Sequence, residues 1–371
     1  MIRQIERLRM DKLYDQPGKF GAWPSLARTA DSELLVVFSG DRKNHIDPYG
    51  KTLLVRSSDA GRSWSEPQLI VNTPFDDRDP GILVLPDGRW LVSLFTSELF
   101  VSWAEEAVSY YGAEEVAAWK PYSDRLTPED YRQYLGNFSL ISADRGASWS
   151  PLRRLPVHGP HGPILDRDGV LLYLGSEIKE SRVDVACYAS SDAGASWQLR
   201  GVLSNAHALP GIYLCEPHLV QLPDGRLLGQ LRVNAADIEK RQLIQSVSAD
   251  GGRSWSPVES TGVWGLPPHL LLHSSGLLLC SYGHRREPFG QRVALSADVG
   301  ASWPQVLSLA EVDYQDCKLA EDVGEIYYQI PDLGYPATVE LADGSLYSVW
   351  YQSRPSGEGA MILGCHWQLT G

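Results

Sequence analysis

The sequence predicts an all-β protein, a six-bladed β-propeller with four-stranded blades and a helical insertion in the second blade. Three observations predict it: a turn motif that occurs five times, a strand-and-hairpin pattern that occurs six times, and a composition rich in turn formers. The chain has 371 residues, with 34 Gly, 24 Pro, 12 Trp and 17 Tyr. Turn formers at this density, with aromatic residues between them, favour many short strands. We expect a single propeller domain over residues 1–371, because large all-β domains can exceed the usual domain length.

The fivefold motif is Ser-x-Asp-x-Gly-x-x-Trp. Its copies begin at Ser57, Ser142, Ser190, Ser248 and Ser296. The aspartate can accept backbone N–H groups within a tight turn, the glycine can adopt the left-handed conformation, and the tryptophan can pack between sheets. The motif therefore predicts a hairpin turn held by its own side chains, and it says little about catalysis. The Asp-to-Asp spacings of 85, 48, 58 and 48 residues are of the order typical of propellers and solenoids.

The sixfold pattern is an apolar strand that begins near a Pro or His and reaches an Asp-Gly-type turn seven residues later. The paired positions are Pro24 and Asp31, Pro80 and Asp87, His161 and Asp168, Pro217 and Asp224, Pro268 and Ser275, and Pro336 and Asp343. Each unit then continues as strand, loop, strand, motif turn and strand, so six units predict a six-bladed ring. The sixth unit lacks the fivefold motif. We expect residues 2–10 to supply its outer strand and close the ring.

One long insertion, residues 97–137, interrupts the second unit between two strands. Thr127 followed by Pro128 predicts the start of a helix, and Gly136 predicts its end. We expect residues 104–119 to be helical as well. Long ordered insertions on a rigid scaffold often form the wall of a binding site. An interface or a decorative pair of helices is the alternative.

Charge and cysteine content exclude several classes of partner. Lys and Arg number 33 against 46 Asp and Glu, and the net charge of -13 argues against a nucleic-acid partner. No apolar run reaches about 18 residues and the first residues lack a signal-peptide core, so we expect no membrane partner and a cytoplasmic location. The five cysteines are Cys187, Cys215, Cys280, Cys317 and Cys365. Their odd number and wide scatter favour reduced thiols. We expect no cofactor and no metal, and the sequence leaves the oligomeric state open.

One face of the predicted propeller collects polar residues. In an up-and-down blade, the start of the first strand lies on the same face as the loop between the second and third strands. The strand starts supply Arg78, Asp79, His158, His161, Glu216, His218, His269 and Tyr335, and the loops supply Arg42, His45, Asp47, Arg232, His284, Arg285 and Arg292. A central pocket with these residue types suits an anionic sugar.

The repeated motifs and this pocket resemble those of the sialidase (neuraminidase) superfamily, and the resemblance covers nearly the whole chain. The matching residues are Arg42 with Asp47 five residues later, Glu216, Arg232, Arg292 and Tyr335. The resemblance implies a retaining glycoside hydrolase with Tyr335 as nucleophile, Glu216 as its partner and Asp47 as the acid/base. A tyrosine, with an ordinary pKa near 10, is a poor nucleophile alone, and a neighbouring carboxylate can take its proton. The predicted substrate-binding residues are Trp23, Arg42, Arg78, Asp79, His161, His218, Arg232, His269, Arg285 and Arg292.

Two positions depart from the family pattern. Ala22 stands where the family places the first arginine of its carboxylate clamp, and Gln352 stands where it places the glutamate that orients this arginine. The two losses belong together, so we expect an altered clamp. The altered clamp argues against ordinary N-acetylneuraminate, so we expect a sialic acid or another acidic sugar as substrate, with Trp23 offering a face for stacking on it.

Two other functions stay open. A polysaccharide lyase acting on uronates uses Tyr and His as acid and base beside an Arg, and this face has all three residue types. A non-catalytic carbohydrate-binding propeller is the third interpretation. Each predicted site residue also has a structural interpretation: strand packing for Tyr335, turn formation for Asp47, ion pairing for Glu216 and the arginines, and inner-strand hydrogen bonding for the histidines.

Overall fold

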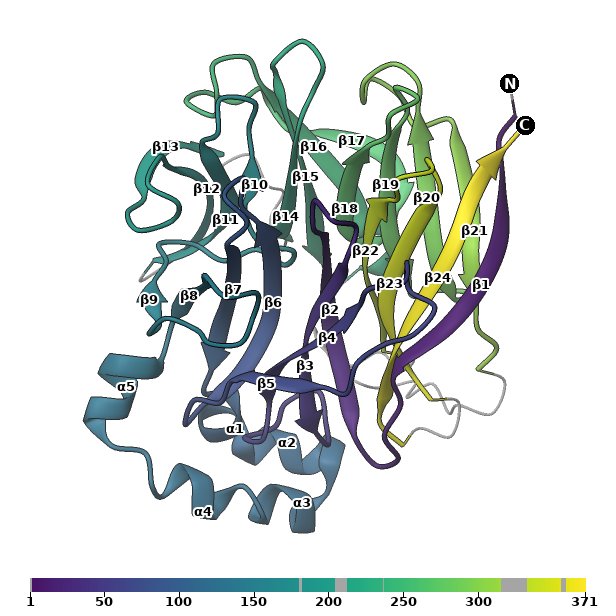
Figure 1. The fold of residues 1–371 in the computed structure, drawn as a ribbon. Helices are drawn as coiled ribbons and strands as arrows, with labels where there is room; N and C mark the ends of the chain where they lie inside the picture. Colours follow the sequence, from purple (N-terminus) through teal and green to yellow (C-terminus); the bar gives the residue numbers. More distant parts are fainter. Residues whose placement is uncertain (1, 180–181, 204–211, 236, 315–331, 355–357) are drawn as a thin grey trace.

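The computed structural model describes residues 2–179, 182–203, 212–235, 237–314, 332–354 and 358–371. Its strands form antiparallel sheets arranged around a common centre, with the helices gathered at one end (Figure 1). First strands of successive units contact one another there, for example β2 with β6 and with β22. The molecule is therefore an all-β propeller.

Among the described residues, four separate sheets have four strands each, in chain order. They are β6 (Asp76–Val84), β7 (Trp90–Ser97), β8 (Asn137–Ser142) and β9 (Arg153–Arg154); β10 (Ile164–Leu165), β11 (Leu171–Lys179), β12 (Arg182–Ser190) and β13 (Gln198–Leu203); β14 (Ile212–Gln221), β15 (Leu227–Ala235), β16 (Gln242–Ser248) and β17 (Glu259–Trp264); and β18 (Leu266–Leu272), β19 (Leu278–His284), β20 (Gly290–Ser296) and β21 (Gln305–Glu311). A short 3-10 helix, Ile238–Lys240, lies between β15 and β16.

The fifth sheet has eight strands and contains the other two expected units. It consists of β1 (Gln4–Tyr14), β22 (Leu333–Glu340), β23 (Leu346–Ser353) and β24 (Ala360–Thr370), together with β2 (Phe20–Arg28), β3 (Leu34–Arg42), β4 (Lys51–Ser57) and β5 (Gln68–Val71). The prediction of six separate blades is corrected here to four blades and one larger sheet. The joint is a single parallel pair between Phe20 and Ala360, supported by a hydrogen bond from Ala360 N to Lys19 O (3.2 Å). β1 runs antiparallel to β24, and the chain then turns back so that β2 starts parallel to the start of β24. Backbone groups at these two strand starts therefore meet.

The expected outer strand at the N-terminus is confirmed. β1 pairs antiparallel with β24 from Gln4 opposite Thr370 to Tyr14 opposite Ile362. Figure 1 shows the two ends of the chain side by side as a result. The pairing joins the first and last segments of the chain in one sheet.

The fivefold motif forms the predicted hairpin turns between third and fourth strands. In the first copy, Ser57 Oγ donates to Asp59 Oδ1 (2.7 Å), and the aspartate accepts from Ser63 N (2.9 Å) and Ser63 Oγ (2.6 Å). The same contacts recur at Asp144, Asp192, Asp250 and Asp298. Trp64 packs on Tyr347 of the neighbouring unit, with ring centroids 5.7 Å apart. The motif therefore stabilises its own turn and the contact between units.

The third unit departs from the expected pattern at its first strand. β10 has only two residues, and His161 lies in a turn before it. Pro160 and Pro163 lack backbone N–H groups, and Gly162 has a φ of +79°. These residues cannot continue a regular ladder, so the strand starts after them.

The insertion between β7 and β8 is helical, as predicted. It contains α1 (Leu99–Ser102), α2 (Ala104–Tyr111), α3 (Ala113–Ala117), α4 (Lys120–Ser123) and α5 (Pro128–Tyr134). Thr127 caps α5, because its hydroxyl accepts from Asp130 N and the Asp130 carboxylate accepts from Thr127 N. Phe100 and Trp119 pack against Ile46 and Phe75. The insertion is thus attached to the loop between β3 and β4.

The hydrophobic core lies between neighbouring sheets. One cluster joins the two halves of the eight-stranded sheet through residues such as Phe38 and Tyr351, and others fill the remaining sheet-to-sheet contacts. Cys187, Cys215, Cys280 and Cys365 are free thiols, and Cys317 lies outside the described residues. Within the described ranges, no helix has the length and apolar character needed to cross a bilayer.

Candidate active site at the centre of the propeller

Four of the first strands carry the same local distortion at their start. Trp23, Asp79, Glu216 and Tyr335 each precede a proline and have φ values of +50°, +44°, +47° and +53°. At each place the pairing with the second strand shifts register. Such bulges redirect a side chain, and a left-handed non-glycine residue costs about 1–3 kcal/mol. The strain recurs at the positions that the sixfold pattern aligns.

Three of these four residues line one cavity of about 510 Å³. The lining residues are His45, Arg78, Asp79, Phe95, Thr96, Ser97, Glu98, Leu99, Leu135, Gly136, Asn137, Glu216, Arg232, Arg285 and Tyr335. Eight of these fifteen come from the two ends of the helical insertion, residues 95–99 and 135–137. The insertion therefore contributes one wall, and the strand starts and loops of the propeller contribute the charged remainder.

Tyr335, Glu216 and Arg232 form a hydrogen-bonded group in this cavity. The Tyr335 hydroxyl donates to Glu216 Oε1 (2.6 Å). Arg232 Nη1 donates to both oxygens of the same carboxylate, at 2.8 and 2.7 Å, and lies 3.5 Å from Tyr335 Oη. The predicted convergence of these three residues is therefore observed. A carboxylate in this position can accept the phenolic proton.

Charge and burial assign protonation states to the group. Burial opposes ionisation of Glu216, but the charge of Arg232 and its hydrogen bonds outweigh burial and hold the pKa of Glu216 below its ordinary value. Burial, and then the Glu216 carboxylate, raise the pKa of Tyr335 well above its ordinary range. At neutral pH the cavity thus holds a carboxylate beside a neutral phenol.

Asp79 differs from Glu216 in its environment. Burial raises its pKa to about 7, and the charge of Arg78 opposes this rise only in part. Asp79 Oδ1 is buried and has no hydrogen-bond partner among the described residues, and the same holds for Arg232 Nε. Buried polar atoms normally have partners. An unpaired acceptor and an unpaired donor in one cavity indicate a place for a polar ligand.

Asp47 does not line the cavity. Its side chain is completely buried, and its oxygens accept backbone N–H groups of Lys43 (2.7 Å), Asn44 (3.1 Å) and Tyr49 (2.6 Å). Burial raises its pKa to about 6. This geometry fits the alternative in which Asp47 forms a turn. It does not fit the predicted role of Asp47 as the acid/base of the reaction.

Arg42 and Trp23 lie beneath the cavity wall. Arg42 is completely buried, pairs with Asp76 (2.8 Å) and donates to Ser39 Oγ (2.9 Å) and Asn44 O (2.9 Å). Trp23 is 1% exposed, with the Arg42 and Arg78 guanidinium groups 4.5 and 4.0 Å from its ring centroid. The prediction that Trp23 offers a stacking face for the sugar is therefore wrong, because the two guanidinium groups cover its ring. Arg78 itself lines the cavity.

The arginine that the fifth unit contributes to the cavity is Arg285, and not the predicted Arg292. Arg292 donates to the carbonyls of Pro288 (2.7 Å) and Ala310 (3.2 Å) and to Ser308 Oγ (3.0 Å). These contacts hold the edge of its own sheet, outside the cavity. Arg285, from the loop between β19 and β20, lines the cavity. Of the predicted arginines, Arg78, Arg232 and Arg285 are brought together.

Three predicted histidines pack on one another away from the cavity lining. His218 and His269 stack with centroids 4.4 Å apart, and His161 meets them edge-on at 5.6 and 4.8 Å. His218 Nδ1 accepts from Leu270 N (2.9 Å), and His269 Nδ1 accepts from Thr338 N (3.4 Å). The rings thus connect neighbouring first strands. No group of three or more His, Cys, Asp or Glu residues in the described part of the chain could hold a metal ion.

We expect His161→Leu to stabilise the fold. Both ring nitrogens of His161 are buried without a partner among the described residues, and leaving such atoms unpaired costs about 1–3 kcal/mol. Burial also holds its pKa well below its usual range, so the unfolded chain takes up a proton first as pH falls below about 6.5. The gain in the free energy of unfolding should therefore be larger at pH 5 than at pH 7. Urea denaturation at both values checks this, and a loss of stability in the variant would contradict the prediction.

The sequence interpretation missed Asp332 and the wall residues. Asp332 directly precedes β22 and accepts from His45 Nδ1 (2.6 Å), which joins two distant segments beside the cavity. Its one local signal is its position just ahead of a first strand. Thr96, Ser97, Glu98 and Asn137 lie at the ends of the insertion, where periodicity gives no indication of orientation.

The arrangement of the sheets, the five motif turns and the central cavity define the class, a BNR-repeat β-propeller that is similar to sialidases. The chain belongs to the BNR repeat-like domain family, whose profile matches residues 127–348, more than half of its length.

Individual relatives are more distant. A sialidase of Micromonospora viridifaciens is 26% identical over 249 residues, which cover 63% of this chain and 36% of that protein. The chain therefore spans about a third of that relative. A Dyadobacter fermentans protein of unknown function superposes with a TM-score of 0.74 at 22% identity, covering 99% of both chains. The NanB sialidase of Streptococcus pneumoniae gives 0.64 at 14% identity, covering 99% of this chain and 70% of that one. At these identities the solved structures support the fold.

Proposed function

We propose that this protein is a retaining glycoside hydrolase that acts on an acidic sugar, a sialic acid or another carboxylated glycoside. The observation that carries the proposal is the contact of 2.6 Å between the Tyr335 hydroxyl and Glu216, inside a cavity lined by three arginines. A neutral phenol suits attack beside a substrate carboxylate, because an anionic nucleophile would be repelled. The named sialidases among the relatives support a carbohydrate substrate.

In the first step, Tyr335 Oη attacks the anomeric carbon while Glu216 accepts the phenolic proton. The glycosidic bond breaks, and its oxygen takes a proton from Asp79. In the second step water attacks the same carbon, gives its proton to Asp79, and the tyrosine oxygen regains its proton from Glu216. The two displacements together retain the anomeric configuration. Asp79 takes the acid/base role predicted for Asp47, because Asp79 lines the cavity and has a pKa of about 7.

Substrate panels with product analysis test this function. Aryl glycosides of N-acetylneuraminate, glucuronate and galacturonate are incubated with the full chain, and proton NMR records the first product formed. Retention of configuration supports the proposal, and inversion contradicts it. An unsaturated product would assign a polysaccharide lyase, and binding without turnover of any acidic glycan would assign a carbohydrate-binding module.

The pH profile should follow Asp79 and Glu216. We expect kcat/KM to be nearly constant above the lowered pKa of Glu216 and to fall above about pH 7, as Asp79 loses the proton that it must donate. Asp79→Asn should remove the alkaline limb and lower kcat/KM by about 10²–10⁴-fold for poor leaving groups, with a small effect for activated aryl leaving groups.

Asp47→Asn is the matched control for this experiment. Asp47 is also a buried aspartate with a raised pKa, but it does not line the cavity. Its variant should keep the alkaline limb. If Asp47→Asn loses the limb and Asp79→Asn keeps it, the acid/base assignment reverses.

A further inference from the structure

We propose that Asp332 is a positioning residue that aims Arg285 at the anionic group of the substrate. The proposal rests on the proposed function, because it names the contact that recognises the substrate carboxylate. Asp332 and Arg285 form a carboxylate–guanidinium pair at the cavity, in a chain that has Ala22 and Gln352 at the two positions that depart from the family pattern.

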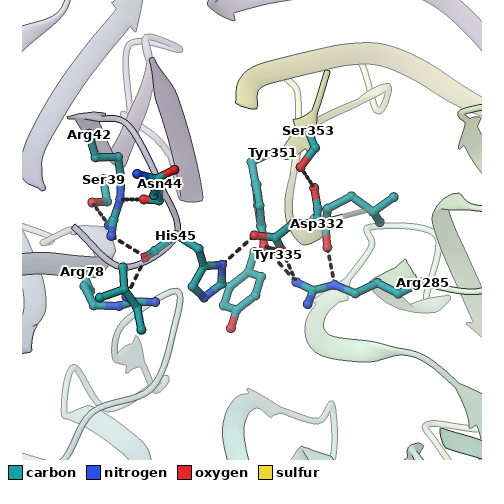
Figure 2. Close-up of polar contacts among 12 residues, drawn as sticks. Ser39, Arg42, Asn44, His45, Arg78, Arg285, Asp332, Tyr335, Tyr351 and Ser353 are labelled. Carbon is teal, nitrogen blue, oxygen red and sulfur yellow. Dashed lines mark hydrogen bonds and ion pairs between the residues drawn. The ribbon is translucent and has the colours of Figure 1, made fainter. Parts of the chain in front are cut away.

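Arg285 is held along one edge. Its Nε donates to Leu333 O (2.6 Å), and its Nη2 donates to Tyr351 Oη (2.8 Å) and lies 3.3 Å from Asp332 Oδ1 (Figure 2). No hydrogen bond of Nη1 occurs among the described residues, although Arg285 lines the cavity. The fixed edge orients the planar guanidinium, and Nη1 remains for a ligand.

The Asp332 carboxylate is fixed from three sides. Figure 2 shows it between His45, which donates from Nδ1 to Oδ2 (2.6 Å), and the pair formed by Tyr351 and Arg285. Its backbone carbonyl accepts from Ser353 N (2.8 Å) and Ser353 Oγ (2.7 Å). Burial opposes ionisation, but His45 and Arg285 outweigh it and lower the pKa of Asp332. The group is thus a rigid carboxylate.

The register of the sheet shows where Asp332 lies relative to Gln352. Gln352 on β23 pairs with Leu333 on β22, so Asp332, the residue before Leu333, lies opposite Ser353, and its carboxylate accepts from Tyr351 Oη on that side of the sheet. A carboxylate is therefore present on this edge of the cavity although position 352 carries none. Ala22 is completely buried and has no guanidinium to offer, whereas Arg285 enters the cavity from the β19–β20 loop.

Arg232 completes the anion site. Its Nη1 is engaged with Glu216, and its Nε is buried without a partner among the described residues. Arg232 and Arg285 line the same cavity and therefore present two guanidinium groups to one ligand. Paired N–H donors of arginine suit a planar carboxylate.

Calorimetric binding to the full chain tests the proposal, with glucuronate, N-acetylneuraminate and their methyl esters as probes. The wild-type protein should bind at least one acid more tightly than its ester. Asp332→Asn should weaken binding of that acid about tenfold and leave binding of the ester unchanged. Glu340→Gln is the matched control, since Glu340 is a carboxylate on the same β22 that pairs with His273 (3.5 Å) outside the cavity. It should keep the preference for the acid.

A second variant keeps the test decisive if Asp332→Asn does not fold. Arg285→Lys keeps the charge but cannot make the three contacts of the guanidinium, so the preference for the acid should fall as in Asp332→Asn. The proposal is overturned if the wild-type protein prefers neither acid over its ester. It is also overturned if Asp332→Asn folds and keeps the preference. If Asp332→Asn does not fold, an Arg285→Lys variant that keeps the preference overturns it. The binding measurement does not require turnover. If the protein shows a preference for the acid that depends on Asp332 but hydrolyses no substrate, this inference stands and only the proposed hydrolase function is overturned.

Discussion

Tyr335→Phe is expected to lower kcat/KM for an acidic aryl glycoside by about a thousandfold or more while leaving its Kd nearly unchanged. The change removes the oxygen that we propose attacks the anomeric carbon, and it retains the ring that packs among Trp23 and Tyr351. The Glu216 carboxylate keeps its contacts with Arg232, so the anion site should persist. Kinetics and calorimetry on the same substrate separate the two effects.

Tyr347→Phe is the matched control. It removes the same hydroxyl from another buried tyrosine whose Oη donates to a carboxylate, Asp11 Oδ2 (2.7 Å), outside the cavity. This variant should keep wild-type kcat/KM. Equal losses in both variants would indicate a structural effect, and full activity in Tyr335→Phe would exclude a tyrosine nucleophile.

Gly81→Ala is expected to have a large effect on stability, about 3 kcal/mol in the free energy of unfolding. A Cβ at Gly81 would lie 2.3 Å from Gly162 N and 2.5 Å from Gly162 Cα, where the second and third units meet. Both are backbone atoms, so no change of rotamer can relieve the overlap. Asp79 lies two residues away, and activity should fall with stability. Urea denaturation followed by tryptophan fluorescence measures the loss.

Gly88→Asn provides the comparison for that variant. Gly88 lies in an exposed hairpin turn with a φ of +85°, and a Cβ there would have no atom within 4 Å. Asparagine tolerates this left-handed conformation better than other side chains, so stability should change by well under 1 kcal/mol. If the two variants lost similar stability, the close approach of Gly81 to Gly162 would not be the cause.

The sequence predicted local structure well because the relevant contacts lie within a few residues. The Ser-x-Asp-x-Gly-x-x-Trp motif closes its hydrogen bonds inside its own turn, so five copies could be identified without tertiary information. The spacing from Pro to the hairpin placed Asp79, Glu216 and Tyr335 at equivalent strand starts. The helix start at Thr127 was likewise local, since its capping contacts span three residues.

Residues outside such short-range motifs were harder to place. Arg285 and Arg292 are seven positions apart, and the sequence does not show which of them faces the cavity and which donates to carbonyls of its own sheet. The same applies to Asp47 and Asp79. One aspartate accepts backbone N–H groups of its own loop, and the other lies at a bulge that opens on the cavity.

The sequence by itself determined a β-propeller with Tyr335, Glu216 and Arg232 on one face, because repeated turns and strand starts are encoded by short-range chemistry. Only the tertiary structure decided that two expected blades join in one sheet, that Arg285 replaces Arg292, and that Asp332 meets His45 across 287 positions of sequence. The physical reason is that these outcomes depend on which buried donors and acceptors from distant segments find each other, and sequence spacing does not specify such pairs.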